Sequence, residues 1–219
     1  MKNFLIAVSL VAVLTGCAST TPSNPIDNEI SSAMLNQQIV QVSHMRPDFS
    51  ALTPSKAPLG ILGAVWMISA GNDIINSNNV QDPAIAIGRE LTKELAVTRG
   101  AKVVPSIITL ESRDAAAIAA AAQGRAPYVL AVETRLWSFG YFPTDWTHYR
   151  VSYVAQARLI DSATGKILGA ASCKRIPDSN AGAPNYDELV GGAAAGLKSE
   201  LAQATTECIA SLKKDLLNL

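Results

Sequence analysis

The chain has 219 residues, of which 48% are hydrophobic and 16% are charged. Eighteen Lys and Arg residues balance eighteen Asp and Glu residues. This composition excludes the basic surface of a nucleic-acid-binding protein, an acidic cation-binding chain and wholesale disorder.

The N-terminus has the layout of a secretory signal that ends at a cysteine. Lys2 supplies a positive charge, and residues 4–14 form an apolar stretch that is too short to span a bilayer. The sequence LTGC, which ends at Cys17, resembles the lipobox of bacterial lipoproteins. That resemblance implies removal of residues 1–16, diacylglycerol on the Cys17 sulfur and a fatty acyl group such as palmitate on its amine. The alternative is a cleaved signal peptide with an incidental cysteine.

The residue after Cys17 is Ala18 rather than Asp. Among lipoproteins this implies the outer membrane, with the protein facing the periplasm. Residues 17–36 are rich in Ser, Thr, Pro and Asn and predict a flexible tether. Residues 37–219 are then expected to form a single periplasmic domain with an apolar insertion at 58–80.

Sequence patterns predict the first elements of that domain. Residues 37–45 alternate in hydropathy, as in a short strand. Asp82 and Pro83 are typical of a helix start, and Gly100 is a suitable C-terminal cap. Residues 102–110 predict another strand.

The second half of the domain begins with a short helix and continues with three strands. Pro105 indicates that the strand before this helix lies at a sheet edge or contains a bulge. Ser112 is the expected cap of an Ala-rich helix that ends before Gly124. Three strand-like segments and one helix follow, at residues 127–142, 146–161, 166–176 and 185–219. Residues 162–165 predict a compact hairpin turn.

The element order β-α-β-α-β-β-β-α predicts an α+β fold. We expect a mixed sheet of about five strands that is covered by helices and followed by a long C-terminal helix. Together with the lipobox, this order resembles the small α/β domain of the TolB N-terminal part and of the CsgG and LpoB group of envelope lipoproteins. Because many functions share one fold, function must be sought in particular sites.

Two cysteines, Cys173 and Cys208, remain after Cys17. An even count in an oxidising compartment predicts a disulfide. The periodicity of the last strand and of the last helix places both sulfurs on inward faces.

Residues 57–71 contain no charge. Leu59, Leu62 and Trp66 would share one face of a helix in this segment. Such a helix is either buried within the domain or a surface element that meets a membrane or a partner, with a pore-forming insertion as a lesser alternative.

Seven of the twelve aromatic residues fall between positions 137 and 153. Either a bulge near Ser138 or Gly140 turns them into the core, or they form an exposed partner-binding patch. The patch would consist of Trp137, Phe139, Tyr141, Phe142 and Trp146.

His44 and His148 are the only histidines, and neither has an evident catalytic partner or metal-ligand spacing. We therefore expect no enzymatic activity, no metal and no cofactor. The expected function is that of a membrane-anchored accessory or scaffold for a cell-envelope assembly, in export or cell-wall synthesis. Its partner would be an envelope protein or further copies of the chain, and not nucleic acid. The alternative is a periplasmic carrier of lipids or small molecules whose pocket the apolar run would line.

Overall fold

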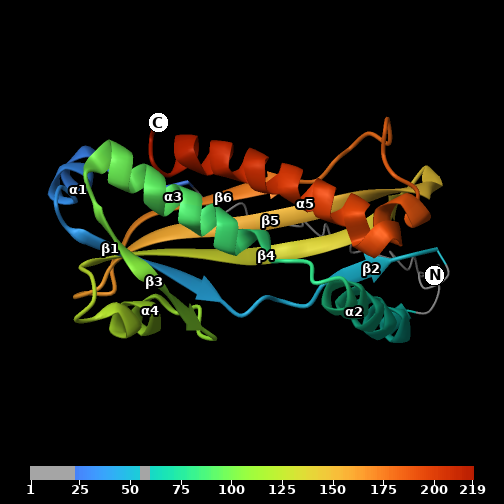
Figure 1. Ribbon diagram of the computed structural model, residues 1–219, viewed down its shortest axis with the longest axis horizontal. Coiled ribbons are helices and arrows are strands. Elements are labelled where there is room, and N and C mark those ends of the chain that lie inside the picture. Colours follow the sequence, from blue (N-terminus) through green and yellow to red (C-terminus); the bar gives the residue numbers. More distant parts are fainter. Residues whose placement is uncertain (1–22, 55–59) are drawn as a thin grey trace, which may run out of the picture.

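The computed structural model describes residues 23–54 and 60–219. Its centre is a six-stranded mixed sheet with the order β3-β1-β4-β5-β6, in which β2 also pairs with β4 (Figure 1). β1 is parallel to both β3 and β4, and β4, β5 and β6 form an antiparallel meander. The strands are β1 (Gln38–His44), β2 (Ser50–Leu52), β3 (Lys102–Leu110), β4 (Tyr128–Phe142), β5 (Asp145–Asp161) and β6 (Ile167–Arg175).

Helices cover the two faces of this sheet unequally. α3 and α5 lie along one face, above the main hydrophobic core, and α4 covers one end of the other face (Figure 1). α2 packs against β2 at the opposite end of the molecule, where its Ile75 joins the main core. The expected α+β class, mixed sheet and long C-terminal helix are confirmed. The helices are α1 (Asn28–Ala33), α2 (Gly60–Ser77), α3 (Pro83–Arg99), α4 (Ala115–Ala122) and α5 (Tyr186–Asp215).

α3 begins and ends as its sequence predicts. The Asp82 side chain caps the helix by accepting a hydrogen bond from the backbone N–H of Ala84, and Gly100 ends it with φ of 67°. Asp82 also accepts a hydrogen bond from the Thr134 hydroxyl, which lies 2.9 Å from the Tyr153 hydroxyl. The cap thus joins α3 to β4 and β5 through a buried polar network.

This buried cap makes stability depend on pH. Burial raises the pKa of Asp82, although the hydrogen bonds from Thr134 and Ala84 act in the opposite direction. Its contribution to stability is therefore present below the unfolded pKa of about 4 and is lost as pH rises through the folded pKa. Asp82→Asn keeps a capping oxygen and cannot ionise. We expect it to gain stability relative to the wild type between about pH 4 and about pH 7.

Urea unfolding at the two pH values measures this difference. Asp114→Asn is the matched control, because Asp114 caps α4 from an exposed position. A difference between wild type and Asp82→Asn that stays the same at both pH values would contradict the prediction.

The structure corrects two expectations about local boundaries. The flexible tether does not extend to residue 36, because Asn24 pairs with Ala170 on the edge of β6 and the side chains of Ile26 and Met34 are buried. The cap of α4 is Asp114 rather than Ser112, since the Asp114 carboxylate accepts the helical N–H of Ala117. In the expected tether, burial of the two apolar side chains Ile26 and Met34 fixes an otherwise polar segment against the domain.

α5 is interrupted near its start, whereas the sequence predicted one continuous helix. Residues 192–194 adopt φ of 56–59°, which is a left-handed turn. Gly191 and Gly192 end the first helical segment. After the turn, Gly196 packs against the backbone of Glu188 and Leu189 in that segment. A Cβ at Gly196 would lie 2.3 Å from the carbonyl oxygen of Glu188, so only glycine allows this approach.

Candidate partner-binding surface

The C-terminal half of α2 fixes this helix to the domain. Ile75 is fully buried, and a Cβ at Gly71 would lie 2.1 Å from the carbonyl oxygen of Phe49. The Asn72 side chain accepts the backbone N–H of Phe49 at 2.9 Å and donates to Asp48 at 2.7 Å. The helix therefore packs closely on the segment that leads into β2.

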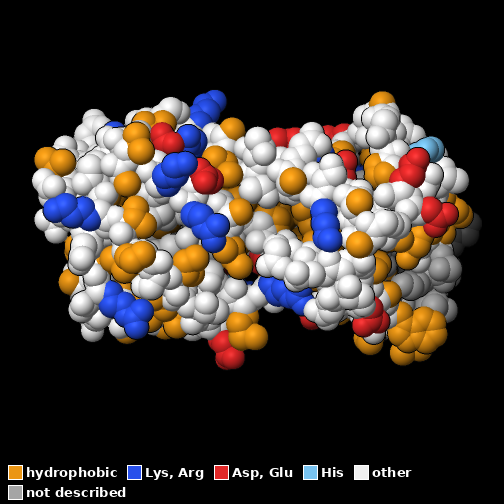
Figure 2. Space-filling view, in the orientation of Figure 1, with side chains coloured by type: hydrophobic (Ala, Val, Ile, Leu, Met, Phe, Trp, Pro, Cys, Tyr) orange, Lys and Arg blue, Asp and Glu red, His pale blue; other side chains and the backbone are white. Residues whose placement is uncertain are grey.

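The N-terminal half of α2 instead exposes large apolar side chains. Leu62, Val65, Trp66 and Ile68 are 70%, 59%, 56% and 38% exposed, and we call these four residues the α2 surface. Figure 2 shows hydrophobic side chains gathered at the lower right, over α2. Of the two main alternatives, the described part of the apolar run is thus a surface element and not a buried helix. Leu59, the first residue expected on this surface, lies outside the described residues.

None of the described helices is both long enough and apolar enough to cross a membrane. Contiguous exposed apolar residues on a domain of this size are typical of an interface. No charged side chain falls within the described segment 60–72. A partner that covers the α2 surface would therefore not have to remove water from a charged group of this segment.

Most of the expected aromatic patch is buried, which corrects that expectation. Trp137, Phe139 and Phe142 are almost inaccessible to solvent. For Trp137 and Phe139 the cause is a bulge between Thr134 and Leu136, three or more residues before the expected position, which turns both side chains into the main core. The indole N–H of Trp137 donates to the Pro47 carbonyl at 2.9 Å, so its polar atom is also satisfied there.

The outer end of the β4–β5 hairpin retains one exposed member of that patch. Trp146 is 64% exposed and lies against the half-buried Tyr141, with ring centroids 5.9 Å apart. Asp145 orders this turn by accepting hydrogen bonds from Thr147, His148 and Asn180, and these bonds lower its pKa. Trp146 is therefore a single aromatic on a firmly held turn rather than part of a broad patch.

The predicted disulfide is confirmed. Cys173 of β6 and Cys208 of α5 are bonded, with their Cα atoms 5.2 Å apart and both side chains buried. The strand and helix periodicities both pointed these residues inward, so the bond joins the last strand to the last helix inside the main core.

Sequence reasoning missed one charged group within the sheet. Glu133 is 2% exposed and contacts the guanidinium groups of Arg113, Arg135 and Arg158. Burial lowers the pKa of the neighbouring His44, and the charges of Arg158 and Arg113 add to this effect against the opposing influence of Glu133. The sequence does contain one indication of this group, because Glu133 is a single carboxylate in a long and mostly apolar strand segment.

The described part of the chain contains no group of three His, Cys, Asp or Glu side chains placed to hold a metal ion. It contains several shallow pockets, of which one of about 370 Å³ lies between the end of β1, the end of α2 and the start of α3. His44, Arg46 and Asp82 are among the residues that line it. His44 and Asp82 belong to the groups described above, and Arg46 donates a hydrogen bond to the side chain of Asn76.

No protein-family model and no curated protein sequence matches the chain. Solved structures that it resembles include the PelC dodecamer from Paraburkholderia phytofirmans, at 15% identity and a TM-score of 0.33 over 83% of this chain and 88% of that one. A DUF330 protein from Xanthomonas campestris shares 16% identity at a TM-score of 0.38, over 87% and 86% of the two chains. A lipoprotein from Neisseria meningitidis shares 20% identity at a TM-score of 0.26, over 78% and 99%. At these values the likenesses carry no argument about what this protein does.

Proposed function

We propose that the protein is a lipid-anchored, non-enzymatic accessory protein of the bacterial outer membrane, which faces the periplasm and binds a protein partner through the α2 surface. The observation that carries the proposal is the exposure of Leu62, Val65 and Trp66 on a helix that is otherwise firmly docked. A helix that was merely part of the core would turn these side chains inward. The lipobox-like sequence at Cys17 supports the anchor.

The position of the first described residues supports a protein partner rather than the anchoring membrane. The Ser23 hydroxyl donates to the carbonyl of Asp215 at 2.8 Å, at the C-terminal end of α5. Figure 1 places this end of α5 opposite α2 along the molecule. Five residues lie between Cys17 and Ser23, so the Cα atoms of these two residues can be at most about 20 Å apart. Acylation at Cys17 would hold the Asp215 end near the bilayer, with the α2 surface at the other end of the molecule.

The double substitution Val65→Asp/Trp66→Asp tests this surface. Charges at these positions are expected to reduce recovery of a cross-linked partner at least about ten-fold, because a buried unpaired carboxylate is strongly unfavourable in an apolar interface. The measurement is cross-linking in intact cells, purification of the tagged lipoprotein from membranes and identification of the proteins recovered. Val97→Asp is the matched control, since Val97 is 77% exposed on α3.

The outcomes separate the alternatives. A stoichiometric envelope protein or second copy, lost in the double variant but retained in Val97→Asp, supports the proposal. Equal recovery from all three proteins contradicts it, provided that each retains the wild-type melting temperature. Stoichiometric binding of a fluorescent fatty acid without any protein partner would instead favour a carrier. In the same preparation, Cys17→Ser should leave the membrane fraction if Cys17 carries the anchor.

A further inference from the structure

Four charged side chains form a compact group on the sheet, which we call the Glu133 cluster. Glu133 and Arg135 come from β4, Arg158 from β5, and Arg113 from the segment between β3 and α4. The Glu133 carboxylate lies 2.8 Å from Arg113, 3.4 Å from Arg135 and 3.4 Å from Arg158. Three elements thus converge on one carboxylate.

The cluster is unbalanced in both charge and hydrogen bonding. One carboxylate faces three guanidinium groups, which leaves two positive charges in excess. Each guanidinium carries five N–H donors. Glu133 meets these groups as an ion-pair partner, and Arg158 donates a hydrogen bond to the carbonyl of Arg113. The Nε atom of Arg158 is buried without a hydrogen-bond partner among the described residues.

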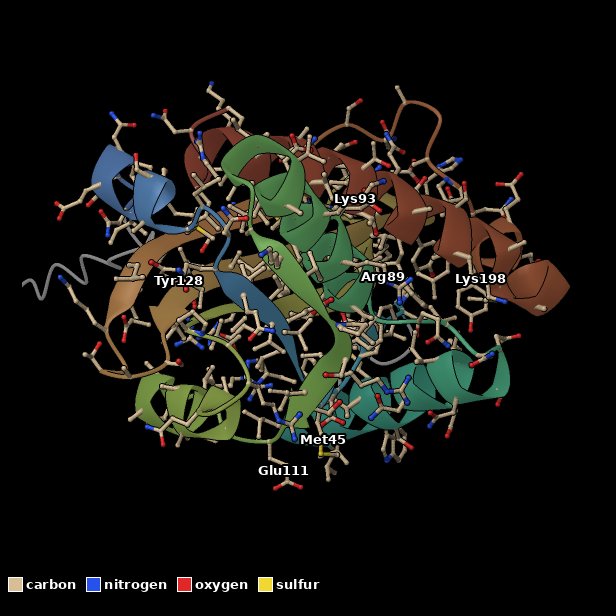
Figure 3. The ribbon with its side chains drawn as sticks, turned by 60° about the vertical axis from the view of Figure 1, so that its left-hand side comes forward. Met45, Arg89, Lys93, Glu111, Tyr128 and Lys198 are labelled. Carbon is tan, nitrogen blue, oxygen red and sulfur yellow. A yellow bond between two sulfur atoms is a disulfide. The ribbon has the colours of Figure 1, made fainter. Side chains whose placement is uncertain are left out.

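The exposure of the four side chains divides the cluster into a floor and a rim. Glu133 and Arg158 are 2% and 11% exposed and form the floor, whereas Arg113 and Arg135 are 43% and 54% exposed. The sheet face here is the one that α4 covers only at one end. Figure 3 shows Glu111, an acidic residue near Arg113 in sequence, pointing away from the body of the molecule. It therefore does not supply the missing negative charge.

We propose that the Glu133 cluster is a binding site for an oxyanion, the carboxylate or phosphate group of a ligand. Glu133 holds the guanidinium groups in place, and the half-exposed Arg113 and Arg135 present N–H pairs in the geometry that recognises planar or tetrahedral oxyanions. The proposal is independent of the α2 surface and concerns a different part of the sheet.

Electrostatics supports a ligand rather than a purely structural role. A carboxylate in a sheet needs one guanidinium for neutrality, and each further guanidinium adds repulsion at close range. The same repulsion acts on His44, whose protonation Arg158 and Arg113 both oppose. An oxyanion bound between Arg113 and Arg135 neutralises the excess charge and raises the pKa of His44, and a purely structural cluster produces no such change.

The test uses the full-length protein in detergent with two probes, inorganic phosphate and glutarate, each compared with sodium chloride at the same ionic strength. NMR signals of the His44 ring and of the Arg158 Nε–H report binding. We expect saturable shifts and a higher pKa for His44 in the bound state. In Arg113→Gln/Arg135→Gln the affinity should fall at least about ten-fold. Arg89→Gln/Arg125→Gln removes the same charge from exposed positions elsewhere and should bind as the wild type does.

Tighter binding of phosphate identifies a phosphorylated ligand, and tighter binding of glutarate identifies a carboxylate ligand. No saturable binding of either probe overturns the proposal, as does an equal loss of affinity in the two double variants. Arg135→Gln alone, at the most exposed position of the cluster, repeats the comparison if the first double variant does not reach the wild-type melting temperature.

Discussion

Replacing Glu133 with leucine is expected to lower the free energy of unfolding by about 3–5 kcal/mol, because it leaves the largely buried guanidinium of Arg158 without its counter-charge. The substitution fills the space of the side chain but removes the carboxylate that contacts the guanidinium groups of Arg113, Arg135 and Arg158. Urea unfolding at neutral pH measures the loss. Arg135→Ala is the control, and we expect it to change stability by less than about 1 kcal/mol because Arg135 is half exposed.

A double variant distinguishes charge from packing as the cause. Glu133→Leu/Arg158→Leu removes both the carboxylate and the most buried guanidinium, and it should be more stable than Glu133→Leu alone. If the loss of stability in the double variant instead equals the sum of the losses in Glu133→Leu and Arg158→Leu, the two side chains act independently. Their interaction would then not explain the stabilising effect of Glu133.

Removing the disulfide is the second large effect. Cys173→Ala/Cys208→Ala should lower the free energy of unfolding by about 3–4 kcal/mol, because the bond closes a loop of 35 residues in the unfolded chain. Both side chains are buried, so alanine avoids placing an unsatisfied hydroxyl in the core. Thermal and urea unfolding of the oxidised protein and of the variant give the difference.

The control for this experiment is the wild type after reduction, which should unfold at the same denaturant concentration as the variant. Two free thiols at Cys173 and Cys208 in protein taken directly from the periplasm would contradict the pairing. Equal stability of variant and oxidised wild type would show that the bond constrains neither the folded nor the unfolded chain.

Local chemistry made several elements predictable. The Asp82–Pro83 start and Gly100 end of α3 follow from capping preferences that act within one or two turns. Pro105 indicated an edge position or a bulge, since proline cannot donate a hydrogen bond to a neighbouring strand. β3 lies at the edge of the sheet, and its pairing with β1 shifts register between Ile39 and Gln41. The Cys173–Cys208 pair followed from two periodicities that agreed.

Features that depend on distant contacts could not be predicted in the same way. The register of Trp137 depends on a bulge at Arg135, and its burial depends on a contact with Phe49, which lies in the connection before β2. The exposure of Trp66 depends on how Gly71 meets the carbonyl of that same Phe49. These contacts join residues that are distant in the sequence, so the pattern within a single helix or strand cannot predict them.

The Glu133 cluster illustrates the same limit for a site. Its members are separated by up to 45 residues in the chain, and the carboxylate meets Arg158 only because β4 and β5 pair with Ala131 opposite Arg158. The sequence of β4 alone could not show that the guanidinium groups of distant residues would gather around Glu133.

The position of β1 between β3 and β4 has a consequence for the order of folding. β1 pairs in parallel with β3 and β4, and Gln41 lies opposite Ile107 on one side and Leu130 on the other. A chain made from its N-terminus therefore presents β1, most of whose side chains end up buried, long before β4 exists. The β4–β5–β6 meander needs only short connections, whereas β1 must close loops of many tens of residues, which slows folding. We therefore expect the insertion of β1 beside β4 to be the slow step of folding, and until it occurs an unpaired apolar strand is open to misassembly.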